Sequence, residues 1–251
     1  MEQIPSNAPV MESKPGVAGW FQVWAKVYTK PSEQTFIEIT DSPDAAAKTA
    51  YIWVFIAGTV SGIFQAIVRA IYTAMGITQQ MPIPGFEEYM PQAAPAGDIG
   101  SVLASLAGGV CAAPIAGLLS IVFFALGVAI VQWIAKLFGG AGSYDKLAYA
   151  FGAISLPLSI VTSVLSLLGA IPFVGICTGI FSLGLSFFAI YLQMAAVKGV
   201  NRFGWGQAAG SVLIPLFVIL FVCGCVVIGG LMLLGPVIGD VFGQINQGLA
   251  P

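Results

Sequence analysis

The chain alternates between long apolar stretches and short polar ones. The apolar stretches cover about residues 50–75, 108–138, 147–168, 174–197 and 208–234. A helix needs roughly 20 predominantly apolar residues to cross a bilayer. The pattern therefore predicts an all-α integral membrane protein, built as a bundle of five transmembrane helices.

The chain divides at about residue 48 into an N-terminal segment and a membrane domain. Residues 1–48 are rich in charged and polar side chains, whereas residues 49–251 hold all five apolar stretches. The N-terminal segment has no apolar run of the kind found in a cleaved signal peptide. We therefore expect the first span to serve as an uncleaved membrane signal.

Residues 19–29 predict an amphipathic helix. Trp20, Trp24 and Tyr28 recur at four-residue spacing, and Gln22 and Lys26 fall on the opposite side. Helices with Trp and Tyr on the apolar face lie in the bilayer interface. The alternative is a helix packed on the cytoplasmic end of the bundle, and both descriptions can hold at once.

Two prolines predict interruptions in these helices. Pro31 ends the first helix, because the residue before a proline disfavours the helical region. Pro157 lies near the middle of the third span, where it frees the carbonyl of Ala153 and predicts a kink. Ser155, Ser159 or a neighbouring helix is expected to bond that carbonyl.

The fifth span is expected to end before Pro236. Apolar residues of the tail, residues 237–249, recur on one face of a helix. This pattern predicts a second short interfacial helix after the last span.

Composition limits the chemistry. The chain has 58% hydrophobic and only 8% charged residues, whereas soluble domains carry about 25% charged residues, so lipid is its main solvent. It has no histidine, which removes the usual general base and the commonest metal ligand. The four cysteines lie in apolar stretches and are expected to be small buried residues. We predict no catalytic, cofactor or metal site and no nucleic-acid partner.

Positive charge alternates with each crossing. All of the nine basic residues except Arg69 fall in the N-terminal segment or in the connections after the second and fourth spans. Cytoplasmic loops carry the excess of Lys and Arg. The sequence therefore predicts a cytoplasmic N-terminus and an extracytoplasmic C-terminus.

Arg69 is the only basic side chain at membrane depth, and no span contains Asp or Glu. A charge inside the membrane is by default a functional hypothesis. Near a helix end, however, Arg extends its head to the interface, and Glu87, Glu88 or Asp98 are potential partners. We favour the structural interpretation.

Three segments carry a family resemblance. They are T-K-P-S-E-Q-T-F (29–36), G-S-Y-D-K (142–146) with Pro157 in the following helix, and Y-L-Q-M-A-A-V-K-G-V-N-R-F-G-W-G-Q-A-A (191–209). In this order and spacing, residues 20–235 resemble the Yip domain family, membrane proteins named for Ypt/Rab interaction.

The resemblance implies five spans and a cytoplasmic N-terminus. Eukaryotic members act in vesicle traffic between endoplasmic reticulum and Golgi, in hetero-oligomers and with Rab GTPases. The chain is more similar to prokaryotic members, which implies a location in a prokaryotic plasma membrane. Its N-terminal segment is short and shows no obvious partner motif, which argues against carrying over Rab binding.

These observations predict a non-enzymatic multi-pass protein that organises membranes or acts as an assembly or trafficking scaffold. Its partners are the lipid bilayer and other membrane proteins or a second copy. The alternative is a permease or channel for small molecules, ions or lipids that uses the Pro-kinked third helix. The candidate structural or partner positions are Trp20, Trp24, Pro31, Phe36, Arg69, Ser143, Tyr144, Asp145, Lys146 and Pro157.

Overall fold

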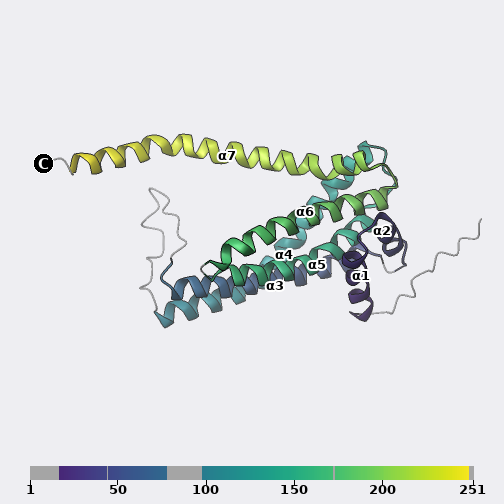
Figure 1. Ribbon diagram of the computed structural model, residues 1–251, viewed down its shortest axis with the longest axis horizontal. Coiled ribbons are helices and arrows are strands. Elements are labelled where there is room, and N and C mark those ends of the chain that lie inside the picture. Colours follow the sequence, from purple (N-terminus) through teal and green to yellow (C-terminus); the bar gives the residue numbers. More distant parts are fainter. Residues whose placement is uncertain (1–16, 44, 78–97, 172, 249–251) are drawn as a thin grey trace, which may run out of the picture.

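The computed structural model describes residues 17–43, 45–77, 98–171 and 173–248. Throughout these ranges the regular structure is helical (Figure 1). The helices are α1 (Val17–Thr29), α2 (Glu33–Thr40), α3 (Ala47–Ala74), α4 (Ile99–Leu137), α5 (Tyr144–Gly169), α6 (Val174–Asn201) and α7 (Trp205–Gly248). The last five are long and apolar enough to cross a membrane. The protein is an all-α, multi-pass integral membrane protein, as its hydrophobic pattern predicts.

Small residues bring α3 and α4 close together. A Cβ added at Gly117 of α4 would lie 2.9 Å from the carbonyl oxygen of Phe55, and one added at Gly62 of α3 would lie 3.0 Å from the Cβ of Ala113. Lipid gives apolar side chains no reason to leave it, so membrane helices associate through such close packing. α5 packs on α3, and α6 packs on α5.

α4 begins at Ile99, earlier than the expected start at residue 108. The side chain of Asp98 accepts hydrogen bonds from the backbone N–H groups of Gly100 and Ser101. This cap satisfies donors that the first turn of a helix leaves free. The small residues of the first turns then continue the helix without a break.

α7 runs without a break from Trp205 through Pro236 to Gly248, so the expectation of a separate tail helix is wrong. A proline removes one backbone donor, and membrane helices tolerate this loss. Where the burial of α7 is described, residues 205–230 and 232, the buried residues Ala208, Ser211 and Val212 lie in its first turns. Figure 1 shows the rest of the helix running away from the bundle.

The four cysteines, Cys111, Cys177, Cys223 and Cys225, are exposed on the protein surface, so the expectation of burial is wrong. In a membrane protein an apolar side chain gains an apolar environment from lipid as well as from the core. An apolar stretch therefore does not show which of its residues face inward.

We predict that Gly117→Ala destabilises the protein, because the added Cβ meets the backbone oxygen of Phe55. Overpacking of this kind costs about 1–3 kcal/mol. The measurement is thermal unfolding in detergent. Gly127→Ala on the same helix is the matched control, because a Cβ there meets nothing within 4 Å. Equal melting temperatures for the two variants would contradict the close packing of α3 and α4.

Candidate functional site

The two short N-terminal helices, α1 and α2, pack on one end of the bundle (Figure 1). We define the leader cap as α1, α2 and the helix ends and loops beside them, residues 132–146 and 191–205. The cap contains residues 29–36 and 142–146 and most of residues 191–209, which belong to the three segments on which the family resemblance rests.

Tryptophans attach α1 to the first span. The rings of Trp20 and Trp24 stand edge-on to the ring of Trp53 in α3, with centroids 5.9 and 5.6 Å away. Trp53 is fully buried, and such aromatic pairs stabilise beyond their buried area. Phe21 of the same helix is exposed. The Trp face of α1 therefore packs on protein, and Phe21 remains on the outer side.

Tyr28 attaches α1 to the third span beside Pro157. Its hydroxyl donates to the carbonyl oxygen of Ile154 at 2.7 Å and has a hydrogen bond with the backbone of Leu158. A side chain thus enters the backbone ladder of α5 next to the proline. Burial raises the pKa of Tyr28, and the bond to Leu158 opposes that rise, so the hydroxyl stays a neutral donor at physiological pH.

The expectation that Ser155 or Ser159 bonds the carbonyl of Ala153 is wrong. Ser155 donates to Phe151, and Ser159 donates to Leu156. A helical serine reaches the carbonyl three or four residues before it. Ala153 lies at neither spacing from either serine.

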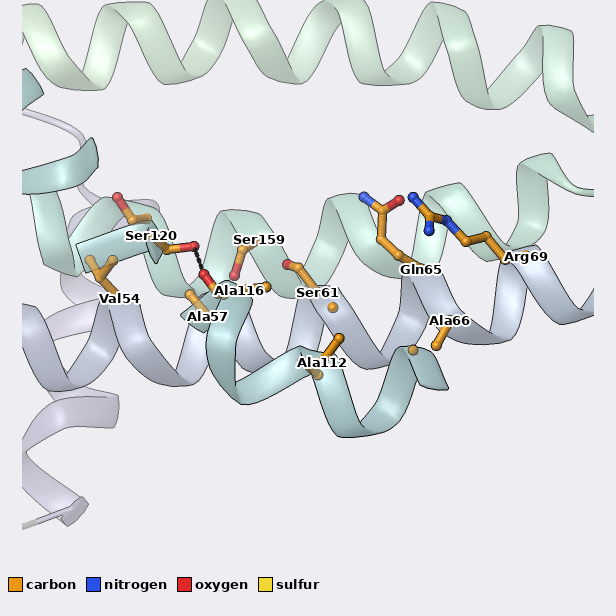
Figure 2. Close-up of a pocket in the computed structure, with 15 residues that line it drawn as sticks. Val54, Ala57, Ser61, Gln65, Ala66, Arg69, Ala112, Ala116, Ser120 and Ser159 are labelled. Atoms are coloured by element: carbon orange, nitrogen blue, oxygen red, sulfur yellow. Dashed lines mark hydrogen bonds between the residues drawn. The ribbon is translucent and has the colours of Figure 1, made fainter. Parts of the chain in front are cut away.

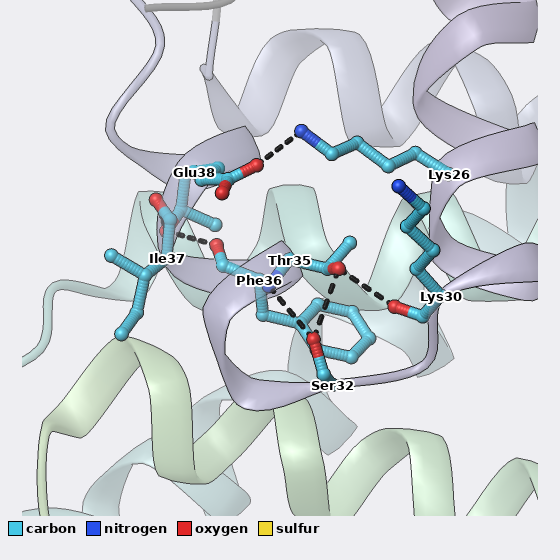
Figure 3. A network of polar contacts seen from close by, with 8 residues as sticks. Lys26, Lys30, Ser32, Thr35, Phe36, Ile37 and Glu38 are labelled. Atoms are coloured by element: carbon cyan, nitrogen blue, oxygen red, sulfur yellow. Dashed lines mark hydrogen bonds and ion pairs between the residues drawn. The ribbon is translucent and has the colours of Figure 1, made fainter. Parts of the chain in front are cut away.

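The T-K-P-S-E-Q-T-F segment folds as a capped turn between α1 and α2 (Figure 3). Ser32 is the N-cap of α2 and accepts from the N–H of Thr35 at 3.3 Å. The Thr35 hydroxyl donates to the Lys30 carbonyl at 2.6 Å. The carbonyl of Pro31 accepts from the hydroxyl of Tyr191 in α6 at 3.2 Å.

α2 lies directly against α6. A Cβ at Gly199 would stand 2.9 Å from the carbonyl oxygen of Glu33 and 3.2 Å from the Cβ of Phe36. Phe36 is fully buried. The absent side chain at Gly199 therefore lets α2 approach the end of α6.

A buried amide network joins the ends of α4, α5 and α6. Gln132 donates to the carbonyl of Gly142 at 2.7 Å and to the side-chain oxygen of Asn201 at 3.1 Å. The same oxygen accepts from the N–H of Gly142 at 3.2 Å, and the Asn201 amide group donates to the carbonyl of Val197. Gln132 and Asn201 are almost fully buried, and the sequence analysis missed both. The sequence feature that could have indicated them is an amide side chain within a long apolar stretch, as for Gln132, or shortly after one, as for Asn201.

Ion pairs surround this network. Asp41 accepts from Lys146 at 2.5 Å and from Arg202 at 3.2 Å. Glu33 pairs with Lys198 at 2.5 Å, and Glu38 pairs with Lys26 (Figure 3). Lys198 also lies 4.7 Å from the ring centroid of Trp205. Partly exposed pairs contribute about 0–1 kcal/mol each, so they orient α2 more than they stabilise the fold.

The G-S-Y-D-K segment starts α5. Ser143 is the N-cap and accepts from the N–H of Lys146 at 3.4 Å. The Tyr144 hydroxyl lies 2.9 Å from the Tyr51 hydroxyl and donates to the carbonyl of Ala125 at 3.2 Å. Asp145 is exposed in the first turn. The segment thus caps α5 and ties it to α3 and α4.

Of the candidate positions, the structure places Trp20, Trp24, Pro31, Phe36, Ser143, Tyr144, Asp145 and Lys146 in the leader cap. Pro157 lies beside the Tyr28 contact. Arg69 lies elsewhere, toward the far end of α3, where it lines a groove with Gln65 (Figure 2). Its suggested partners Glu87 and Glu88 lie outside the described residues.

Within the described ranges, no group of three or more His, Cys, Asp or Glu side chains is placed to hold a metal ion. The polar groups of the leader cap bond one another across helix ends. This arrangement holds the polar side chains of the cap in fixed positions.

The Yip1 domain family model matches residues 25–226. This range starts within α1, includes α2 through α6 and ends within α7. No curated protein matches the chain, and no solved structure matches it.

We predict that Tyr28→Phe destabilises the protein by about 1 kcal/mol, because the Ile154 carbonyl loses a buried donor. Thermal unfolding and hydrogen exchange of α1 measure the effect. Tyr191→Phe is the control: that tyrosine is exposed, so water replaces its bond to Pro31. An equal effect of the two substitutions would show that the insertion into α5 has no special weight.

Proposed function

The chain belongs to the Yip1 domain family, and from this premise we propose that it is a non-enzymatic membrane protein that acts as an assembly scaffold. The observation that carries the proposal is the leader cap. Segments separated by more than a hundred residues form one ordered polar platform at one end of the bundle.

The outer face of the platform suits protein recognition. The exposed residues there are Lys30, Gln34, Arg202 and Trp205. Asp41 pairs with Arg202, and the Lys198 ammonium lies over the ring of Trp205, so both side chains are held in place. Arginine and aromatic side chains are enriched in protein interfaces. Because the cap is already ordered, a partner that binds it incurs little ordering cost.

The partners proposed are other membrane proteins or a second copy, with the bilayer as the common environment. The short N-terminal segment gives no support for Rab binding. The proposal requires a platform on the cytoplasmic side, where soluble and membrane partners both reach it.

The basic residues of the described chain, except Arg69, gather at the capped end of the bundle. This supports a cytoplasmic position of the cap by the positive-inside rule. We predict that a reporter fused after Pro251 is active only when it requires an extracytoplasmic location. A matched fusion before Met1 should behave in the opposite way. A cytoplasmic reporter at Pro251 would overturn the orientation.

We predict that a photocrosslinker at Gln34 captures specific membrane-protein partners in cells, whereas one at Met75, exposed at the other end of α3, does not. Asp41→Asn should reduce the capture several-fold, because it removes the negative partner of both Lys146 and Arg202. Asp145→Asn, an exposed acid on the same end, is the control. Equal capture at Gln34 and Met75 would contradict a recognition platform.

The transport alternative has one structural observation in its favour. Ser155 and Ser159, which flank Pro157, line the groove that contains Arg69. Flux of ions or labelled lipid through liposomes tests it. Robust flux that is lost in Pro157→Ala would replace the scaffold proposal with a transport function.

A further inference from the structure

A groove of about 570 Å³ lies between α3, α4 and α5. Figure 2 shows Gln65 and Arg69 extending side by side from α3, with Ser61 and Ser159 further along. The rest of the wall is mostly small and apolar: Ala57, Gly58, Gly62, Ala66, Ala112 and Ala116. The groove is therefore lined mostly by small residues, including four serines, and has a cationic end.

The position of Arg69 along α3 places its charge near a membrane surface. α3 has 28 residues, or about 42 Å at 1.5 Å per residue. With α3 centred in the bilayer, the Cα of Arg69 stands about 13 Å from the midplane, just inside a hydrocarbon half-thickness of about 15 Å. A long arginine side chain from this depth reaches the level of lipid phosphates.

Nothing in the lining balances this charge. The residues that line the groove include no acid, and the ion pairs of the described ranges do not involve Arg69. Asp98, one suggested partner, accepts from Gly100 and Ser101 at the start of α4. A cation at the edge of a low-dielectric region favours an anion beside it.

We propose that this groove binds one anionic phospholipid, with its phosphate on Arg69 and Gln65 and one acyl chain along the small-residue wall. Arginine bonds two phosphate oxygens at once, and the Gln65 amide adds a neutral donor. A lipid fits better than a soluble anion, because membrane-spanning helices form all the walls and the wall beside the cation is apolar. The site is distinct from the leader cap and does not depend on the scaffold proposal.

The test is lipid retention by the purified full-length protein, measured by native mass spectrometry after incubation with phosphatidylglycerol. We expect one retained lipid in the wild type, and about tenfold weaker retention in Arg69→Gln. Arg69→Lys should retain an intermediate amount, because it keeps the charge and loses the paired bonds. Lys30→Gln, at the capped end, is the charge-matched control and should retain lipid as the wild type does. Melting temperatures establish that each variant is folded.

Further arms identify the source of the anion. Phosphatidylcholine in place of phosphatidylglycerol should be retained weakly, and inorganic phosphate should not raise the melting temperature. Stabilisation by inorganic phosphate without a preference for phosphatidylglycerol would overturn the lipid assignment. Equal retention by wild type and Arg69→Gln would overturn the site. The remaining outcome is an internal ion pair of Arg69 with Glu87 or Glu88. It would be assigned if Arg69→Gln and Glu87→Gln/Glu88→Gln each lowered the stability, if the combined variant lost less than the sum of the two losses, and if lipid retention were unchanged.

Discussion

The buried Asn201 side chain is the contact on which the capped end of the molecule depends. Where a helix ends, some of its backbone N–H and C=O groups have no hydrogen-bond partner within the helix. Such groups that are held away from water need hydrogen-bond partners elsewhere in the protein. Asn201 supplies both a donor and an acceptor at the point where α4 and α6 end and α5 begins, and Gln132 adds a second donor there. Networks of this kind fix one arrangement of the elements that they join.

The leader cap builds on this fixed base. α2 packs beside Gly199, close to Asn201 in the chain, and Asp41 after α2 bonds both Lys146 and Arg202. The N-terminal helices are therefore placed by the spans. The polar platform and Arg69 lie at opposite ends of the same bundle, so the recognition of protein and of lipid proposed here would use separate surfaces.

Hydrophobic pattern predicted the architecture well, because a bilayer leaves few alternatives to apolar helices. The same pattern failed where lipid and core look alike: the cysteines face outward, and α7 continues past Pro236. It could suggest that α1 docks on the bundle but not where, since the contact between Tyr28 and Ile154 joins residues 126 positions apart. Gln132 and Asn201 stand 69 positions apart, and neither residue alone indicates the other.

The Tyr28 hydroxyl occupies a place in the backbone ladder of α5, and this has a mechanical consequence. A force that lifts α1 from the bundle also removes the donor from the Ile154 carbonyl, which lies within a membrane-crossing helix beside Pro157. Displacement of the N-terminal helix would therefore remove a hydrogen bond from the third span next to its proline.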